Sequence, residues 1–323
     1  MTDPGIHNEG ILIHAGVASF FGREQRNVSD LTGIRCAIAG VPWDEGSAGR
    51  AGAGYGPRAF RDASSWTDGY DAQRDFDLWG VLPTADVGDV LVVPTNSART
   101  MENVAEHVRL LRQNDVFPVS IGGNHSITIG AARGAASTVG RMGYLSIDAH
   151  LDMAESWLGE QYFNGCPTYR ATELENVDPR NVVVFGVRGW LNPRSSVEAA
   201  RELGVRWYGM DAIEEVGFER AVAEAIAHAT DGVDGLYVTF DLDAVDPAYA
   251  PGVGAPEPGG FTSRQALQLA RMVGTAEPIA FDLVELAPVH DPSTNSARLA
   301  CAITVSLLSA MSDGTAPVDD SAS

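Results

Sequence analysis

Acidic and imidazole side chains follow four short apolar segments of this sequence, and their types suit metal chemistry. The segments are residues 117–121, 144–147, 236–240 and 279–284, and the ionisable residues that follow them are His125, then Asp148, His150 and Asp152, then Asp241 and Asp243, and finally Glu285. If the segments are parallel strands of one sheet, all of these side chains gather at the carboxyl edge of that sheet.

Two of these clusters place ionisable residues two positions apart. In an extended chain, residues i, i+2 and i+4 face the same way, so Asp148, His150 and Asp152 are expected to point into one pocket. Asp241 and Asp243 repeat the spacing. Carboxylates gathered in this way repel one another unless they are protonated or bound to cations. A metal site resolves that conflict.

The donor atoms indicate which metals and how many. Four carboxylates and two imidazoles, without a thiolate, suit Mn, Ni, Fe or Zn better than a structural zinc site. Six ligands exceed what one catalytic ion with an open position needs, and they suit two ions about 3.5–4 Å apart. Taken singly, an Asp-x-His in a loop is usually solvated, and Glu285 fits an ordinary charged strand terminus equally well, so only the joint pattern indicates a metal centre.

The elements that must position these clusters alternate between strands and helices. The expected strands are residues 34–39, 117–121, 144–147, 182–187, 205–208, 236–240 and 279–284. Most are apolar throughout, which is typical of strands buried on both faces of a parallel sheet. The expected amphipathic helices are residues 97–113, 195–203, 218–229, 263–272 and 295–311. We therefore predict an α/β fold, a three-layer α/β/α arrangement with a mainly parallel sheet.

Charge and composition limit the partners and the chemistry. The formal charge of −21 opposes binding to nucleic acids and anionic membranes, whereas it would attract a small cationic substrate. An equally simple reading is that the acidic surface keeps the protein soluble. All 22 basic residues are arginine. The absence of lysine excludes Schiff-base chemistry, pyridoxal phosphate anchoring and a P-loop.

Length and segment composition predict one catalytic domain over residues 1–312 and a disordered tail over residues 313–323. The first ten residues are also polar and are expected to be frayed. The sequence has no signal-like start and no apolar stretch near the roughly 20 residues that cross a bilayer, which predicts a cytoplasmic protein. Cys36, Cys166 and Cys301 lack metal-knuckle or disulfide spacing and are expected to be reduced and mostly buried.

The motifs resemble those of the ureohydrolase family, which includes arginases and agmatinases. Residues 122–126, Gly-Gly-Asn-His-Ser, resemble the family's Gly-Gly-Asp-His-Ser, and residues 148–152 match its Asp-Ala-His-x-Asp. The longest match runs from Thr239 through Ala250-Pro251-Gly252 to Gly260. The resemblance extends from Gly40 to the closing helix and inclines toward the agmatinase branch. It implies an arginase-like fold and a homo-oligomer, commonly a trimer or hexamer.

The resemblance also implies roles for the clustered residues. One ion site would be formed by His125, Asp148, Asp152 and Asp241, and the other by Asp148, His150, Asp241 and Asp243, with Asp148 and Asp241 bridging. The usual metal of the family is Mn²⁺, and Ni²⁺ is an alternative. The ions would activate water to attack a guanidinium carbon, which yields urea and an amine. Asp152 would orient the water or carry its proton, and Glu285 would pair with the guanidinium.

The chain departs from the family pattern at two positions beside the expected site. Asn124 replaces the usual Asp, which removes a charge and is expected to tune the metals rather than remove them. Asn164 replaces a His that lies near the substrate and shuttles protons. An amide cannot carry a proton at neutral pH, so Asn164 is expected to bind substrate while the leaving group is protonated by another route, unless the substrate differs.

These departures leave the substrate open. Residues 153–169 contain Glu155 and Glu160 but no arginine, which favours an amine tail and therefore agmatine, hydrolysed to putrescine and urea. The alternatives are guanidinobutyrate, free guanidine and formimidoylglutamate. Two other classes also remain, namely a non-catalytic subunit that keeps the fold and metals, and a deacetylase on a related metal-binding fold.

Overall fold

A central sheet of eight parallel strands organises the molecule. The computed structural model describes residues 16–312, so the tails predicted at the first ten residues and at residues 313–323 lie outside the described residues. The strands are β1 (Cys36–Val41), β4 (Thr84–Asp89), β5 (Phe117–Gly122), β6 (Met142–Ile147), β7 (Val182–Val187), β8 (Arg206–Gly209), β9 (Gly235–Asp241) and β10 (Ala280–Val284). Their order across the sheet is β4-β1-β5-β10-β9-β6-β7-β8. A separate antiparallel hairpin pairs β2 (Tyr70–Asp71) with β3 (Phe76–Asp77).

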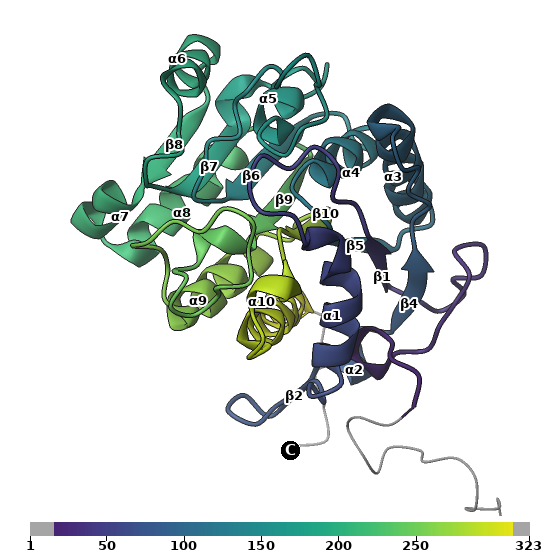
Figure 1. Cartoon of the computed structure of the whole chain (residues 1–323). Coiled ribbons are helices and arrows are strands. Elements are labelled where there is room, and N and C mark those ends of the chain that lie inside the picture. Colours follow the sequence, from purple (N-terminus) through teal and green to yellow (C-terminus); the bar gives the residue numbers. More distant parts are fainter. Residues whose placement is uncertain (1–15, 313–323) are drawn as a thin grey trace, which may run out of the picture.

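Helices cover both faces of this sheet and bury a core on each. One core includes side chains from α1 (Gly56–Ser64), α2 (Leu78–Val81), α7 (Met210–Val216), α8 (Phe218–Ala229), α9 (Ser263–Gly274) and α10 (Asn295–Ser312). The other includes side chains from α3 (Ser97–Gln113), α4 (Ile127–Ala136), α5 (Pro167–Thr172) and α6 (Arg194–Leu203). Figure 1 shows α3 and α4 on one side of the strands and α9 and α10 on the other. The predicted three-layer α/β/α arrangement is confirmed.

The apolar strands explain the two cores. Successive residues of a strand point to opposite faces, so Ile38 enters the core under α1 and Ala39 enters the core under α3. All residues of β1, β5 and β6 are buried. The sequence therefore carries no polar face on these strands, as predicted.

The predicted elements agree best where the pattern is periodic. The bounds of α3, α8 and β7 match the prediction, and Asn96 caps α3 by accepting a hydrogen bond from the Arg99 N–H. β4 is not among the predicted strands, because half of its residues, Thr-Ala-Asp-Val-Gly-Asp, are polar. This strand lies at the edge of the sheet, where it pairs with β1 and, through an isolated bridge, with Gln25. Its last three residues are not buried, so they need no apolar face.

The sheet order brings the four ionisable clusters together. The strands that precede them, β5, β10, β9 and β6, are consecutive neighbours in the sheet. Because all four run parallel, their carboxyl ends meet at one edge, as predicted. Among residues 16–312, no helix is long and apolar enough to span a membrane.

Candidate metal centre

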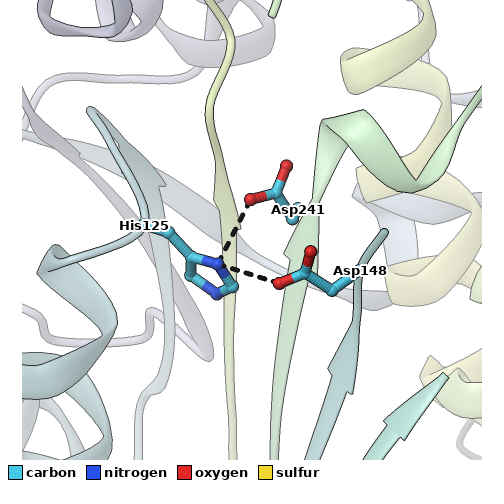
Figure 2. A group of neighbouring side chains, drawn as sticks. All are labelled: His125, Asp148 and Asp241. Atoms are coloured by element: carbon cyan, nitrogen blue, oxygen red, sulfur yellow. Dashed lines mark ion pairs between the residues drawn. The ribbon is translucent and has the colours of Figure 1, made fainter. Parts of the chain in front are cut away.

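The first group of ionisable side chains surrounds Nδ1 of His125. The Oδ2 atoms of Asp148, Asp152 and Asp241 lie 3.1, 2.9 and 3.1 Å from this nitrogen. Figure 2 shows His125, Asp148 and Asp241 pointing toward one another from neighbouring segments. Three strand ends thus supply one cluster, in which these three residues are almost fully buried.

A second group forms around His150. Its Nδ1 lies 3.1 Å from Oδ2 of Asp243 and 3.6 Å from Oδ1 of Asp148. Asp148 therefore turns one carboxylate oxygen to each histidine. The oxygens of Asp241 contact His125 and the backbone N–H of Asp243, so its bridging between two ions stays a prediction.

The carboxylates are oriented by turns that follow the strands, and not by extended backbone. β6 ends at Ile147, and Asp152 adopts a left-handed backbone with φ of 50°. Asp243 lies in a short 3₁₀ helix, Leu242–Ala244, where its N–H donates to Oδ1 of Asp241 at 2.8 Å. The predicted grouping is present, but the alternation offered as its reason is wrong, because the chain leaves the strand conformation beyond the sheet.

Burial and mutual repulsion alter the proton affinities of this cluster. Burial, together with the charges of Asp243 and Asp148, raises the pKa of Asp241 well above its usual range. Burial and the charge of Asp148 raise the pKa of Asp152 to about 6. Burial lowers the pKa of His125, but its hydrogen bonds with the three carboxylates outweigh burial and raise the pKa well above its ordinary value. In the absence of a metal, bound protons thus offset the negative charge of the cluster, a role that divalent cations would take when bound.

The spacing and the hydrogen bonds of the cluster fit a metal ion. Ligands at about 2.1 Å from one ion lie roughly 3 Å from one another when they subtend a right angle. The contacts around Nδ1 of His125 are 2.9–3.1 Å, although that nitrogen carries at most one proton for three carboxylates. A metal-binding imidazole commonly hydrogen-bonds through its other nitrogen. Nε2 of His125 lies 3.0 Å from Oγ1 of Thr239.

Glu285 lies beside the cluster with one free oxygen. Its Oε1 accepts hydrogen bonds from the His125 N–H at 2.9 Å and from Nδ2 of Asn164 at 3.1 Å. Its Oε2 is buried and has no hydrogen-bond partner among residues 16–312. Burial raises the pKa of Glu285 to about 7. A buried carboxylate oxygen without a donor is suited to a cationic ligand that supplies N–H groups.

A cavity of about 360 Å³ opens above these residues, within the range of small-molecule sites. Six of the predicted site residues line it, namely His150, Asp152, Asn164, Asp241, Asp243 and Glu285. His125 and Asp148 lie beneath them and are 1% and 0% exposed. All eight predicted site residues therefore lie in or directly under one cavity.

Asn124 and Asn164, the two residues that depart from the family pattern, both form hydrogen bonds with residues 45–48. Nδ2 of Asn124 donates to the Glu45 carbonyl at 2.8 Å. Oδ1 of Asn164 accepts from the Ala48 N–H, and the Asn164 N–H donates to the Gly46 carbonyl. Ala48 lines the cavity, so these amides hold part of its wall. An aspartate at position 124 has no N–H to offer to Glu45 when ionised.

We expect Asn124→Asp, which introduces the residue usual in the family, to lower the free energy of unfolding of this protein. The change keeps the oxygen that accepts from Ser126 but removes the donor to the Glu45 carbonyl, a partly buried hydrogen bond worth about 0.5–1.5 kcal/mol. Denaturant unfolding and kcat/KM measured on the same protein check this expectation. Asn103→Asp, which changes an amide on α3 that binds the Leu91 carbonyl, is the control. Unchanged or greater stability of Asn124→Asp would contradict the role assigned to its amide.

Several residues around the site escaped the sequence analysis. Thr239, bonded to His125, is two residues before Asp241 in β9, and a polar residue in an apolar strand was the available signal. Asn192 holds the turn after β6 by accepting from the Leu151 N–H and donating to the Ala149 carbonyl. No local pattern identifies that role, because the partners are about 40 residues away.

The cysteines take no part in the centre. Cys36, Cys166 and Cys301 are free and buried, as predicted. Cys166 follows the cavity residue Gly165, but burial raises the pKa of its thiol to about 11. A thiol that stays protonated is a poor nucleophile, so Cys166 is suited to packing rather than to catalysis.

Comparison with known proteins gives consistent matches. The family model described as "Arginase family" matches residues 34–309. Proclavaminate amidinohydrolase of Streptomyces clavuligerus is 34% identical over 85% of this chain and 88% of its own length, and its structure superposes with a TM-score of 0.87 over 93% and 99% of the two chains. Guanidinopropionase of Pseudomonas aeruginosa is 32% identical over 89% and 90%. A hypothetical agmatinase from Burkholderia thailandensis has a TM-score of 0.84 at 29% identity over 98% of both chains.

Proposed function

The chain belongs to the arginase family, and from that premise we propose that it is a dinuclear metal-dependent hydrolase that releases urea and an amine from a small guanidino compound. The arginase-like fold and the assignment as a hydrolase of this family are as the sequence predicted. The observation that carries the proposal is the shared carboxylate of Asp148, which faces His125 with one oxygen and His150 with the other. The described sheet and its two helical layers form one unit around this point, which supports a single catalytic domain over residues 1–312.

We assign two ions to the two groups. His125, Asp148, Asp152 and Asp241 would hold the first, and Asp148, His150, Asp241 and Asp243 would hold the second. The nitrogen and oxygen donors suit Mn²⁺ and also admit Ni²⁺. When bound, two such ions would lower the pKa of a water molecule between them and so supply a nucleophile at neutral pH.

The side chains of the cavity would bind the substrate and move its protons. The free Oε2 of Glu285 would pair with the guanidinium and hold its planar carbon over the centre. Asp152, at the cavity wall, would accept the proton released as water attacks that carbon and return it to the departing amine. The carbon–nitrogen bond to the amine then breaks, and urea remains.

Asn164 takes a positioning role in this scheme. Its amide lies between the Ala48 N–H and Oε1 of Glu285, so both ends are occupied by the protein. Asn164 would therefore orient Glu285 rather than transfer protons. Proton return to the amine would be left to Asp152, as the route that replaces the family's histidine.

Agmatine is tested before the guanidino acids, because no arginine lines the described cavity and a carboxylate tail would meet no positive charge there. Guanidinobutyrate, free guanidine and formimidoylglutamate are the alternatives. We expect a homo-oligomer, commonly a trimer or hexamer in this family, with neither nucleic acid nor membrane as a partner. The relatives reported above are named for amidino and guanidino substrates, which favours this class over a deacetylase.

The proposal is tested with protein stripped of metal and reloaded separately with Mn²⁺ or Ni²⁺. Urea, ammonia, formamide and acetate are measured with each candidate substrate and an acetylated amine, and metal content is measured on the same sample. Urea that appears only after reloading supports the proposal. Formamide or ammonia without urea favours a formimidoyl substrate, and acetate favours a deacetylase. Two ions per chain without any product would indicate a non-catalytic subunit.

A further inference from the structure

The outer part of the cavity has apolar walls. Trp157 and Phe163 line it, with their ring centroids 5.5 Å apart and an angle of 24° between the rings. Trp190, Leu191 and Pro193 also line it, from the segment that follows β7. Trp157 is 54% exposed and Phe163 is 7% exposed, so the stacked pair reaches from the mouth of the cavity to its interior. These side chains lie beyond the ionisable floor and play no part in the chemistry proposed above.

The cavity offers a substrate tail no cationic partner. The ionisable residues among its described lining are His150, Asp152, Asp241, Asp243 and Glu285. Two nearby arginines already donate hydrogen bonds to backbone carbonyls. Arg188 donates to the carbonyls of Asp243, Ala244 and Glu257. Arg50 donates to the carbonyl of Val253. A carboxylate tail would lose its water without gaining a counter-charge.

An ammonium tail has no dedicated acceptor on these walls either. Glu155 and Glu160, which favoured an amine tail in the sequence, do not line the cavity. The carboxylate of Glu160 accepts hydrogen bonds from the Tyr162 N–H and from Oγ of Ser97. The two glutamates that favoured an amine tail in the sequence therefore lie outside the lining of the described cavity.

We propose that the Trp157–Phe163 wall is a subsite for an uncharged apolar tail, so that the preferred substrates are alkylguanidines or arylguanidines rather than guanidino acids. This inference rests on the proposed function, since it concerns the tail of the same guanidino substrate. Each methylene that leaves water for the wall is worth about fourfold in kcat/KM.

Three guanidines of nearly equal length test the subsite. Pentylguanidine, agmatine and 4-guanidinobutyrate differ mainly in a terminal methyl, ammonium or carboxylate group. With the metal-loaded enzyme, kcat/KM is expected to be highest for pentylguanidine, lower for agmatine, and lower by at least about tenfold for 4-guanidinobutyrate. A higher kcat/KM for agmatine or for 4-guanidinobutyrate than for pentylguanidine would overturn the proposal.

A pair of variants on one loop locates the subsite. Trp157→Ala is expected to lower kcat/KM for pentylguanidine by about tenfold or more while leaving methylguanidine, which has no tail, within about twofold. Leu158→Ala is the matched control, because Leu158 is 95% exposed and is not among the residues that line the cavity. Equal losses for the two substrates, or equal losses in the two variants, would remove Trp157 from the subsite.

A wrong hydrolase assignment and a wrong subsite can be told apart. If protein with two ions per chain hydrolyses none of these compounds, the hydrolase assignment fails first. The tail preference is then measured by calorimetric binding of pentylguanidine and 4-guanidinobutyrate to the same protein. Tighter binding of 4-guanidinobutyrate would overturn the subsite as well, whereas tighter binding of pentylguanidine, weakened by Trp157→Ala, would support it.

Discussion

Replacing Asp148 by Asn is expected to lower kcat/KM by at least about 10³-fold and to reduce the metal content of the purified protein below one ion per chain. Asp148 contributes an oxygen to each of the two groups, so the amide weakens both proposed ion sites together. Catalytic ions contribute several kcal/mol, and about 1.4 kcal/mol corresponds to tenfold in rate. Metal analysis and steady-state kinetics on the same sample measure the two effects.

Asp152→Asn is the informative comparison for this prediction. Asp152 contacts His125 but not His150, so its loss is expected to leave the second ion in place. Asp178→Asn, at an exposed carboxylate paired with Arg180, reports the effect of removing a surface charge alone. Retention of both ions by Asp148→Asn would refute the assignment of Asp148 as a bridging ligand, even if activity were lost.

Glu285→Gln is expected to keep two ions per chain and yet lose about 30-fold to a few thousandfold in kcat/KM. Glutamine keeps an oxygen for the His125 N–H and the Asn164 amide but removes the charge that faces the guanidinium. Losing one partner of a buried charge pair typically costs about 2–5 kcal/mol, which corresponds to that range. Kinetics with the best substrate and metal analysis of the same preparation check both parts.

Glu257→Gln separates this effect from the general negative field of the protein. Its carboxylate accepts from the N–H groups of Trp190 and Leu191 beside the cavity and is not among the residues that line it. An amide oxygen can replace those acceptor contacts, so we expect kcat/KM within about twofold of the parent enzyme. If Glu257→Gln and Glu285→Gln lose activity equally, the pairing of Glu285 with the guanidinium is wrong.

Much of the centre was predictable because its signals are local. A strand buried on both faces must be apolar, so acids and imidazoles directly after β5, β6, β9 and β10 stand out in the sequence. The parallel direction of the strands then requires that these residues share one edge. Neither step depends on the details of packing, and both are confirmed by the sheet order.

Helix α4 shows why other elements could not be predicted. Its sequence, Ile-Thr-Ile-Gly-Ala-Ala-Arg-Gly-Ala-Ala, lacks the polar face of an amphipathic helix and contains two glycines, which disfavour a helix. A Cβ at Gly130 would lie 2.5 Å from the Met101 carbonyl oxygen, and one at Gly134 would lie 2.3 Å from that of Ala105. The glycines therefore allow α4 to pack closely against α3, a requirement set by the neighbouring helix.

The sequence by itself determined the family, the layered α/β architecture and the residues of the candidate metal centre, because residue type and strand polarity are properties of short segments. The tertiary structure decided how those residues are aimed and what surrounds them. Asn124 and Asn164 are 40 positions apart and both fasten residues 45–48. Trp157 and Trp190 enter one cavity from separate loops. Such convergence depends on where distant segments meet, and no single segment of the chain encodes it.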